Sequence, residues 1–157
     1  MIKANVIIED KSWFKFIKNP KNFLDKKIKK IEKDKFFIRN KKYYFTLLLS
    51  NSKKIKKLNK KFRNKNKSTD ILSFPFYNYE EMKKSIKLNE DIYLGDIILN
   101  IKKLERDKGV KKFKSHFDIL WIHGLLHLLG HDHKSNTKYL KMKKLENKFS
   151  YLIKKNA

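Results

Sequence analysis

Residues 119–133 read ILWIHGLLHLLGHDH, and they hold the longest apolar run of the chain. From residue 119 to residue 129 every position is apolar except His123, Gly124 and His127. A helix that is apolar on all sides lies in the core of a domain rather than at its surface. The sequence therefore predicts a long central helix against which the other elements pack.

The spacing of three histidines in this stretch predicts a metal site. His123 and His127 are four residues apart, so on a helix they lie one turn apart on the same face. Gly130 can adopt a positive φ and end the helix, which allows the chain to turn back and bring His133 to the same point. Three imidazole ligands with coordination positions left open are typical of a catalytic zinc site. A metal would also satisfy ring nitrogens that are buried in a core helix.

The two remaining histidines and one aspartate have less defined roles. All five histidines of the chain fall between His116 and His133. His131 is only two residues from His133, so both side chains can hardly approach one ion, and we do not count His131 as a ligand. His116 fits a solvated or capping residue better than a ligand. Asp132 fits either of two roles, which are to orient a ligand imidazole or to cap the last helix.

The same histidine spacing occurs in the metzincin zinc proteases, whose motif is H-E-x-x-H-x-x-G-x-x-H. In this chain Gly124 stands where those proteases carry the glutamate that acts as general base. Without that carboxylate the zinc-bound water lacks its base for peptide hydrolysis, which argues against a protease. A glycine inside a helix costs about 1 kcal/mol relative to alanine. The position therefore favours a small residue, either to leave room for a substrate or to allow close packing.

The elements outside the central helix predict an α+β fold. Four apolar or aromatic runs predict strands at residues 5–9, 43–49, 69–74 and 92–99. Helical spacing and capping residues predict helices at residues 20–34, 55–62, 100–109, 113–129 and 137–153. Pro75 should end the third strand, Gly95 should mark a bend or a close backbone approach, and residues 83–91 should form a polar loop. We expect a single α+β domain over residues 1–157, with a mixed sheet of about four strands, about five helices and a metzincin-like zinc helix.

The composition narrows the class of protein and the kind of metal ligand. The chain has 157 residues and no cysteine, so it fits one domain without disulfides, and any metal must be held by histidine, carboxylate or water. The first ten residues lack the layout of a signal peptide. The longest apolar run, residues 119–129, is far shorter than the roughly 20 residues that a membrane helix needs. We therefore expect a soluble cytoplasmic protein with no membrane partner.

The net charge of +25 has two explanations. A strongly basic chain favours a polyanionic partner, with nucleic acid as the first candidate. However, nearly all the positive charge is lysine spread along the whole chain, and arginine occurs only at positions 39, 63 and 106. The chain is also rich in asparagine, isoleucine and phenylalanine, which is the composition that an AT-rich genome encodes. Both explanations stay open at this point.

Four blocks of the sequence closely resemble the YbeY family of bacterial endoribonucleases, also called rRNA maturation factors. The first block, His123 to His133, matches the pattern H-G-x-L-H-L-x-G-[YH]-D-H throughout. The second runs from Asn59 to Pro75 and is similar to N-x-x-[YF]-R-x5-T-[DN]-V-L-S-F-P. The third is Leu94-Gly-Asp-Ile97, and the fourth is Met142-x-x-Leu145-Glu146. Together they span nearly the whole chain.

Two places differ from the family's pattern. Family members often carry a further histidine four residues before the first ligand, where this chain has Ile119. A usually acidic stretch after the third ligand is replaced by Lys134-Ser-Asn-Thr-Lys138. Both changes alter the surroundings of the histidine motif and leave the motif itself intact.

The resemblance implies a metal and a catalytic residue. It assigns one zinc ion to His123, His127 and His133, and it makes Arg63 the residue needed for RNA cleavage. The chemistry agrees, because a phosphodiester transition state gathers charge on oxygens that zinc can polarise and a guanidinium can bind bidentately. Arg63 also fits a simple surface charge on a helix. The neighbouring lysines suit either a groove for single-stranded RNA or a solvated face; they are Lys56, Lys57, Lys60, Lys61, Lys65 and Lys67.

The resemblance further implies a zinc-dependent, single-strand-specific endoribonuclease of the cytoplasm. Such a protein matures the 3′ end of 16S rRNA and takes part in ribosome quality control. Its partners would be single-stranded RNA, rRNA and the small ribosomal subunit, with no specificity for DNA. Two other classes remain: a metalloprotease-like hydrolase, which the missing glutamate disfavours, and a non-catalytic ribosome-assembly factor whose zinc only stabilises the fold.

Overall fold

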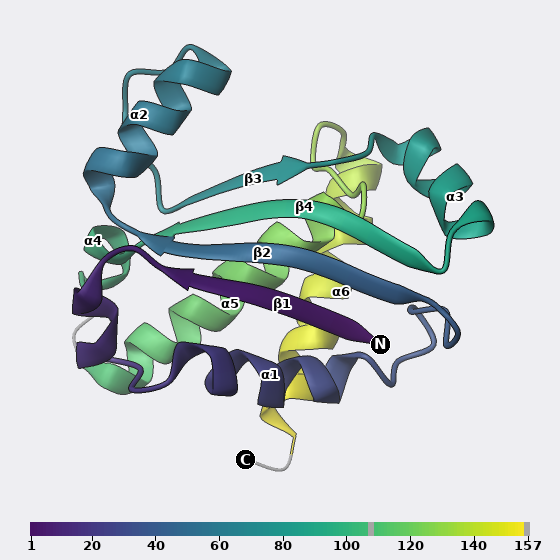
Figure 1. Cartoon of the computed structure of the whole chain (residues 1–157), viewed down its shortest axis with the longest axis horizontal. Coiled ribbons are helices and arrows are strands. Elements are labelled where there is room, and N and C mark those ends of the chain that lie inside the picture. The colour runs from purple at the N-terminus through teal and green to yellow at the C-terminus, as the bar shows by residue number, and fades with distance from the viewer. Residues whose placement is uncertain (107–108, 156–157) are drawn as a thin grey trace.

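A four-stranded mixed sheet forms the centre of the computed structural model, which describes residues 1–106 and 109–155 (Figure 1). In the order in which they lie side by side, the strands are β1 (Ile2–Ile8), β2 (Lys42–Ser50), β4 (Asp91–Asn100) and β3 (Ile71–Pro75). The first three of these are parallel, and β3 runs antiparallel to β4 at the edge of the sheet. The predicted strands and the mixed character of the sheet are confirmed.

Helices cover mainly one face of this sheet (Figure 1). On that face lie α1 (Pro20–Ile31), α5 (Val110–Leu128) and α6 (Asn136–Lys154), with α1 packed against β1 and α5 against β3 and β4. The other described helices are α2 (Ser52–Arg63), α3 (Tyr79–Leu88), α4 (Ile101–Leu104) and a short 3-10 helix at Lys11–Lys15. Within residues 1–106 and 109–155, no helix combines the length and the apolar composition that crossing a membrane requires.

Side-chain alternation explains which face of the sheet the helices cover. Alternate residues of β2 are buried in the main core; they are Tyr43, Phe45, Leu47 and Leu49. Because successive side chains of a strand point to opposite faces, these four lie on the side of α1 and α5. On the opposite face, Ile55 of α2 packs with Leu72 and Ile98 in a smaller cluster. The α+β fold and the central position of α5, which is buried on most sides, are confirmed.

The predicted polar loop at residues 83–91 is wrong, because α3 occupies Tyr79–Leu88. Asn78 starts this helix through a capping box: its side chain accepts from the backbone N–H of Glu81, and the carboxylate of Glu81 accepts from the backbone N–H of Asn78. Met82 is buried beneath the helix. The described residues therefore hold six α-helices instead of five. The short helix was missed because most of its residues are charged or exposed, and only Met82 and Ser85 are buried.

The helix predicted at residues 100–109 is shorter than expected. Asn100 caps it as predicted, since its side chain accepts from the backbone N–H of Lys102. The helix ends at Leu104, whose side chain is buried in the main core. The last part of the prediction includes residues 107–108, which lie outside the described residues.

Gly95 bends β4 and allows the edge strand to approach it. Its φ is +125°, and the pairing between β2 and β4 shifts register next to it. A Cβ atom at this position would lie 2.1 Å from the carbonyl oxygen of Phe74, so only glycine fits. Both the bend and the close backbone approach predicted for Gly95 are confirmed. The consequence is that β3 lies tightly against β4.

Candidate active site

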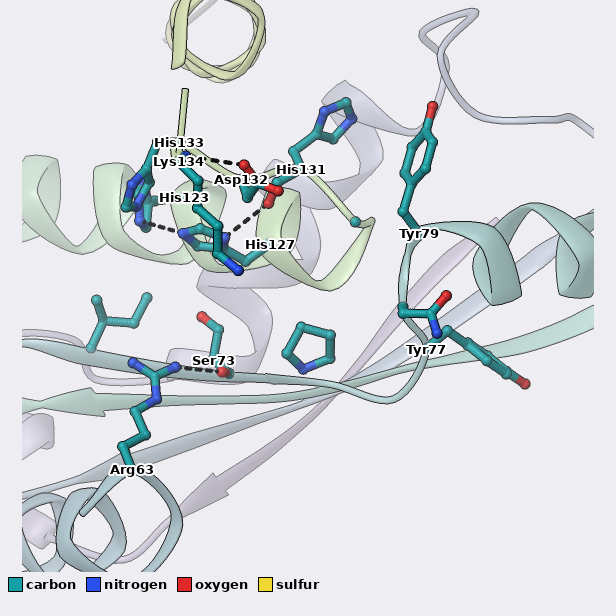
Figure 2. A pocket seen from close by; sticks show the side chains of 14 residues that line it. Arg63, Ser73, Tyr77, Tyr79, His123, His127, His131, Asp132, His133 and Lys134 are labelled. Atoms are coloured by element: carbon teal, nitrogen blue, oxygen red, sulfur yellow. Dashed lines mark hydrogen bonds between the residues drawn. The ribbon is translucent and has the colours of Figure 1, made fainter. Parts of the chain in front are cut away.

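Three histidines converge at the C-terminal end of α5. His123 and His127 lie on the same face of the helix, one turn apart, and Gly130, with a φ of +87°, turns the chain so that His133 returns to them (Figure 2). One ligand atom from each lies within 4.8 Å of the others. The Nε2 atoms of His123 and His127 are 3.0 Å apart. Two nitrogens bound to one tetrahedral zinc at 2.0–2.1 Å would be roughly 3.3 Å apart, so these histidines can hold a metal ion.

The outer nitrogens of two of these rings are fixed by acceptors. His123 Nδ1 lies 2.7 Å from the Oε1 atom of Glu146 on α6, and His127 Nδ1 lies 2.9 Å from the carbonyl oxygen of His131. A carboxylate and a carbonyl can only accept, so both Nδ1 atoms donate and both Nε2 atoms keep a free lone pair for a metal. This arrangement is the usual support of metal-binding histidines in proteins.

Glu146 is the residue of this site that sequence reasoning missed. It lies in the fourth matching block of the sequence, but nothing in its local pattern distinguishes it from other acidic residues of an amphipathic helix. Its role depends on the packing of α6 against α5, which brings together residues 23 positions apart. The signal that could have pointed to Glu146 was its place in that matching block, whose other two matching residues, Met142 and Leu145, pack in the core.

The structure separates His131 and Asp132 from the three converging side chains. His131 points away from them and lies against Phe36, with ring centroids 5.8 Å apart, so only its backbone carbonyl serves the site (Figure 2). Its exclusion as a ligand agrees with the prediction. Neither role predicted for Asp132 is observed. Its carboxylate accepts from the backbone N–H of Lys134 and from Lys138 Nζ, and Ser135 caps α6 instead.

Burial keeps His127 neutral. The pKa of His127 is lowered to about 4. The largest cause is removal of the ring from water, and the second is the charge of the nearby His123. Arg63 also contributes to this lowering, which is a sign that its charge lies close to the site. A histidine must be neutral to bind a metal through its ring nitrogen, so His127 is available as a ligand across the physiological pH range.

A cleft of about 540 Å³ joins the histidines to Arg63. Its walls come from β3, the start of α3 and the segment that follows α5. Arg63 is the last residue of α2, and its Nη2 atom donates to the carbonyl oxygen of Ser73 at 2.9 Å (Figure 2). The guanidinium also lies over the ring of Phe74, 5.7 Å from its centroid. The four residues predicted as site residues therefore line one cleft.

Gly124 faces the sheet and not the cleft. A Cβ atom built there would lie 3.0 Å from side-chain carbons of Ile71 and Ile97. Of the two reasons predicted for a small residue, close packing is therefore the one observed. The contact lets α5 approach β3 and β4 closely, and any larger side chain at this position would press against the sheet.

The lysines around Arg63 are exposed. The set is Lys56, Lys57, Lys60, Lys61, Lys65 and Lys67, and none of its members lines the cleft. They lie on α2 and on the segment that follows it. The cleft of about 540 Å³ is the first of two clefts at the histidines, and the positively charged side chains that line it are Arg63 and Lys134.

Known proteins resemble this chain over nearly its whole length, and not only at the site. The family model described as Endoribonuclease YbeY matches residues 8–153. A protein named Endoribonuclease YbeY from Pelagibacter ubique is 45% identical over 156 residues, which cover 98% of this chain and 97% of that protein. Another of the same name, from a Wolbachia of Drosophila simulans, is 33% identical over 152 residues, covering 93% of this chain and 91% of that one.

A solved structure shares the fold. The solution structure of a Thermotoga maritima protein covers 98% of this chain and 89% of its own, with a TM-score of 0.54 and 23% sequence identity. At that level of identity the likeness concerns the arrangement of the sheet and helices alone.

Proposed function

This chain belongs to the YbeY family, and we propose that it is a zinc-dependent endoribonuclease that cleaves single-stranded RNA. The observation that carries the proposal is one cleft lined by three convergent histidines and by an arginine. The resemblance extends the proposal to maturation of the 3′ end of 16S rRNA and to ribosome quality control, with the small ribosomal subunit as partner. We place this activity in the cytoplasm and assign it to residues 1–157 as one catalytic domain.

One zinc ion is the metal that this donor set favours. His123, His127 and His133 offer imidazole nitrogens, which suit zinc, and the chain has no cysteine to form a closed structural site. Such an ion supplies a Lewis acid for a phosphoryl oxygen and lowers the pKa of a bound water. The protein's part is to hold the rings, with Glu146 and the carbonyl of His131 fixing the orientation of two of them.

Arg63 is proposed to bind the phosphate that is cleaved. One of its N–H groups is used by the carbonyl of Ser73, which fixes the orientation of the guanidinium and leaves its other donors for a ligand. A guanidinium matches two phosphate oxygens at once, and its fixed position avoids reorganisation as negative charge develops. Lysine presents a single charged point and would match this geometry less well.

The packing of Gly124 supports RNA cleavage over peptide hydrolysis. The metzincin-like protease needs a glutamate at this position, and here the sheet occupies the space that a side chain would need. A purely structural zinc site fits less well than a catalytic one, because the three histidines line an open cleft that also presents an exposed arginine.

The test is a comparison of substrates and variants. Purified protein is given single-stranded RNA, duplex RNA, single-stranded DNA and an unfolded protein, each with and without a chelator. We expect cleavage of single-stranded RNA only, abolished by the chelator and by His127→Ala, and reduced roughly 100-fold or more by Arg63→Ala. Arg39→Ala is the matched control, because Arg39 is also exposed but lies beside Glu32, outside the cleft.

The rival functions give different results in the same assay. Proteolysis would overturn the proposal, and so would RNA cleavage that both His127→Ala and Arg63→Ala retain in full. Zinc binding and stable folding without any RNA cleavage would indicate a non-catalytic assembly factor. Circular dichroism of each variant shows whether a loss of activity reflects a loss of fold.

A further inference from the structure

A second cleft lies on the other side of the converging histidines. It has a volume of about 450 Å³ and lies between β3, α5 and α6. His123 and His133 line both this cleft and the first one, so the proposed metal position is the boundary that the two clefts share. A linear substrate bound across that boundary would occupy both clefts at once.

The walls of the second cleft are largely apolar. They include Ile71, Leu120, Met142 and Ile119, and Ile119 is 55% exposed although it belongs to the core helix α5. The two carboxylates of this cleft already have partners. Glu146 accepts from His123 and Lys143, and Asp70 accepts from the backbone N–H of Ile71 and from Thr69 Oγ1. The cleft therefore suits a flat, uncharged group better than a phosphate.

Tyr139 presents an aromatic ring at this cleft. It lies in the first turn of α6 with 51% of its surface exposed, and it lines the cleft on the same helix as Met142. Lys143 is four residues further along α6 and therefore lies on the same face. Its ammonium group pairs with Glu146, but the side chain is 51% exposed and an ammonium has three N–H donors, so it can bind a backbone phosphate as well. An aromatic ring beside a cation is the combination with which proteins bind the base and the backbone of single-stranded nucleic acids.

We propose that the RNA strand crosses the histidines from the first cleft into the second, and that a base next to the cleaved phosphate stacks on Tyr139. This inference rests on the proposed function. The first cleft supplies charge through Arg63 and Lys134, and the second supplies an aromatic surface. A base within a duplex is already stacked and paired, so a site of this kind selects single strands.

The experiment compares tyrosines of the same helix on substrates of different length. Tyr151 is the matched control, because it also lies on α6, is 63% exposed and lies outside the second cleft. On a single-stranded oligoribonucleotide with a mapped cleavage position, Tyr139→Leu should raise KM about tenfold and leave kcat within about twofold. Tyr139→Phe, which keeps the ring, and Tyr151→Leu should both behave like the wild type.

Trimmed substrates then identify the side on which Tyr139 acts. Oligonucleotides are shortened from the 5′ end or from the 3′ end to a single abasic nucleotide on that side of the cleaved phosphate, so that the bond to be cleaved stays and the neighbouring base is absent. The difference between wild type and Tyr139→Leu should vanish for one of these two series and persist for the other. Thermal unfolding and zinc content of Tyr139→Leu should match those of the wild type.

Two results would overturn the inference: equal KM values for wild type and Tyr139→Leu on every substrate, or a difference that survives trimming from both ends. Failure of the proposed function is a separate outcome, because the wild type would then cleave none of the RNAs. A wild type that cleaves while Tyr139→Leu is unchanged therefore removes only the stacking site.

Discussion

Replacing Glu146 is expected to weaken zinc binding while leaving the protein folded. Its carboxylate lies 2.7 Å from His123 Nδ1, and only 17% of the Glu146 side chain and 28% of the His123 side chain are exposed. A hydrogen bond to a charged group in such a place contributes about 1.5–3 kcal/mol. At about 1.4 kcal/mol for each factor of ten, this predicts roughly a 10- to 100-fold loss of zinc affinity in Glu146→Ala.

The amide variant separates the charge of Glu146 from its shape. In Glu146→Gln the side-chain oxygen can still accept from His123 Nδ1, so we expect a loss of roughly tenfold, at the lower end of this range. Zinc affinity is measured by competition with a chromophoric chelator at neutral pH. The matched control is Glu105→Gln, because the Glu105 side chain is also mostly buried, with 25% exposed. Each of the two glutamates pairs with a lysine three residues before it: Glu105 Oε2 lies 3.1 Å from Lys102 Nζ, and Glu146 Oε2 lies 3.2 Å from Lys143 Nζ.

Support of the zinc site by Glu146 is excluded if Glu146→Ala binds zinc as tightly as the wild type while circular dichroism shows a native fold. It is equally refuted if Glu105→Gln loses as much affinity as Glu146→Gln. In either case the support of His123 would not depend on the carboxylate. A global loss of structure in Glu146→Ala alone would leave Glu146→Gln as the deciding variant.

Three further predictions concern packing, phosphate binding and pH. Gly124→Ala should lower the free energy of unfolding by up to about 2 kcal/mol in urea titrations, because the roughly 1–3 kcal/mol cost of a Cβ 3.0 Å from three side-chain carbons of the sheet exceeds the roughly 1 kcal/mol that alanine gains in a helix; a stability higher by about 1 kcal/mol would refute the close packing. Arg63→Lys should lose most RNA cleavage while Arg39→Lys keeps it, and full activity in Arg63→Lys would show that two-point phosphate binding is not required. Burial opposes ionisation of Asp34, but hydrogen bonds from Lys148 and a backbone N–H outweigh it and lower the pKa of Asp34. A lowered carboxyl pKa stabilises the fold at pH values above the ordinary value of 3.8 and ceases to do so as the pH falls through the folded value. Asp34→Asn should therefore destabilise the protein at pH 7 by about 1 kcal/mol, with the difference becoming smaller as the pH falls below 3.8; a difference that stays constant as the pH is lowered would contradict this.

Features governed by local sequence could be predicted well. The apolar run before Leu129 predicted the core helix, and the spacing of His123 and His127 placed both rings on one face, because a helix has a fixed period. Gly130 predicted the turn that follows, since positive φ favours glycine. Gly95 was predicted for a similar reason, with its backbone too close to Phe74 for any side chain.

Features that depend on contacts between distant elements could not be predicted in the same way. The role of Glu146 arises only when α6 packs on α5, and the second cleft exists only between α5, α6 and β3. Helix α3 was missed because the capping pair of Asn78 and Glu81 is a weak signal beside a run of charged residues. The reason for Gly124 also lay in the tertiary structure, because the sheet that it touches is distant in sequence.

The three candidate ligands, the core helix that carries two of them and the family to which the chain belongs can be read from the order of the residues. The packing of the fold is what places Arg63, on a separate helix, in the same cleft and brings Glu146 to His123. The physical reason is that helix periodicity and backbone conformation are properties of neighbouring residues. The meeting of side chains across a cleft is instead set by how the sheet and helices pack to bury their apolar faces.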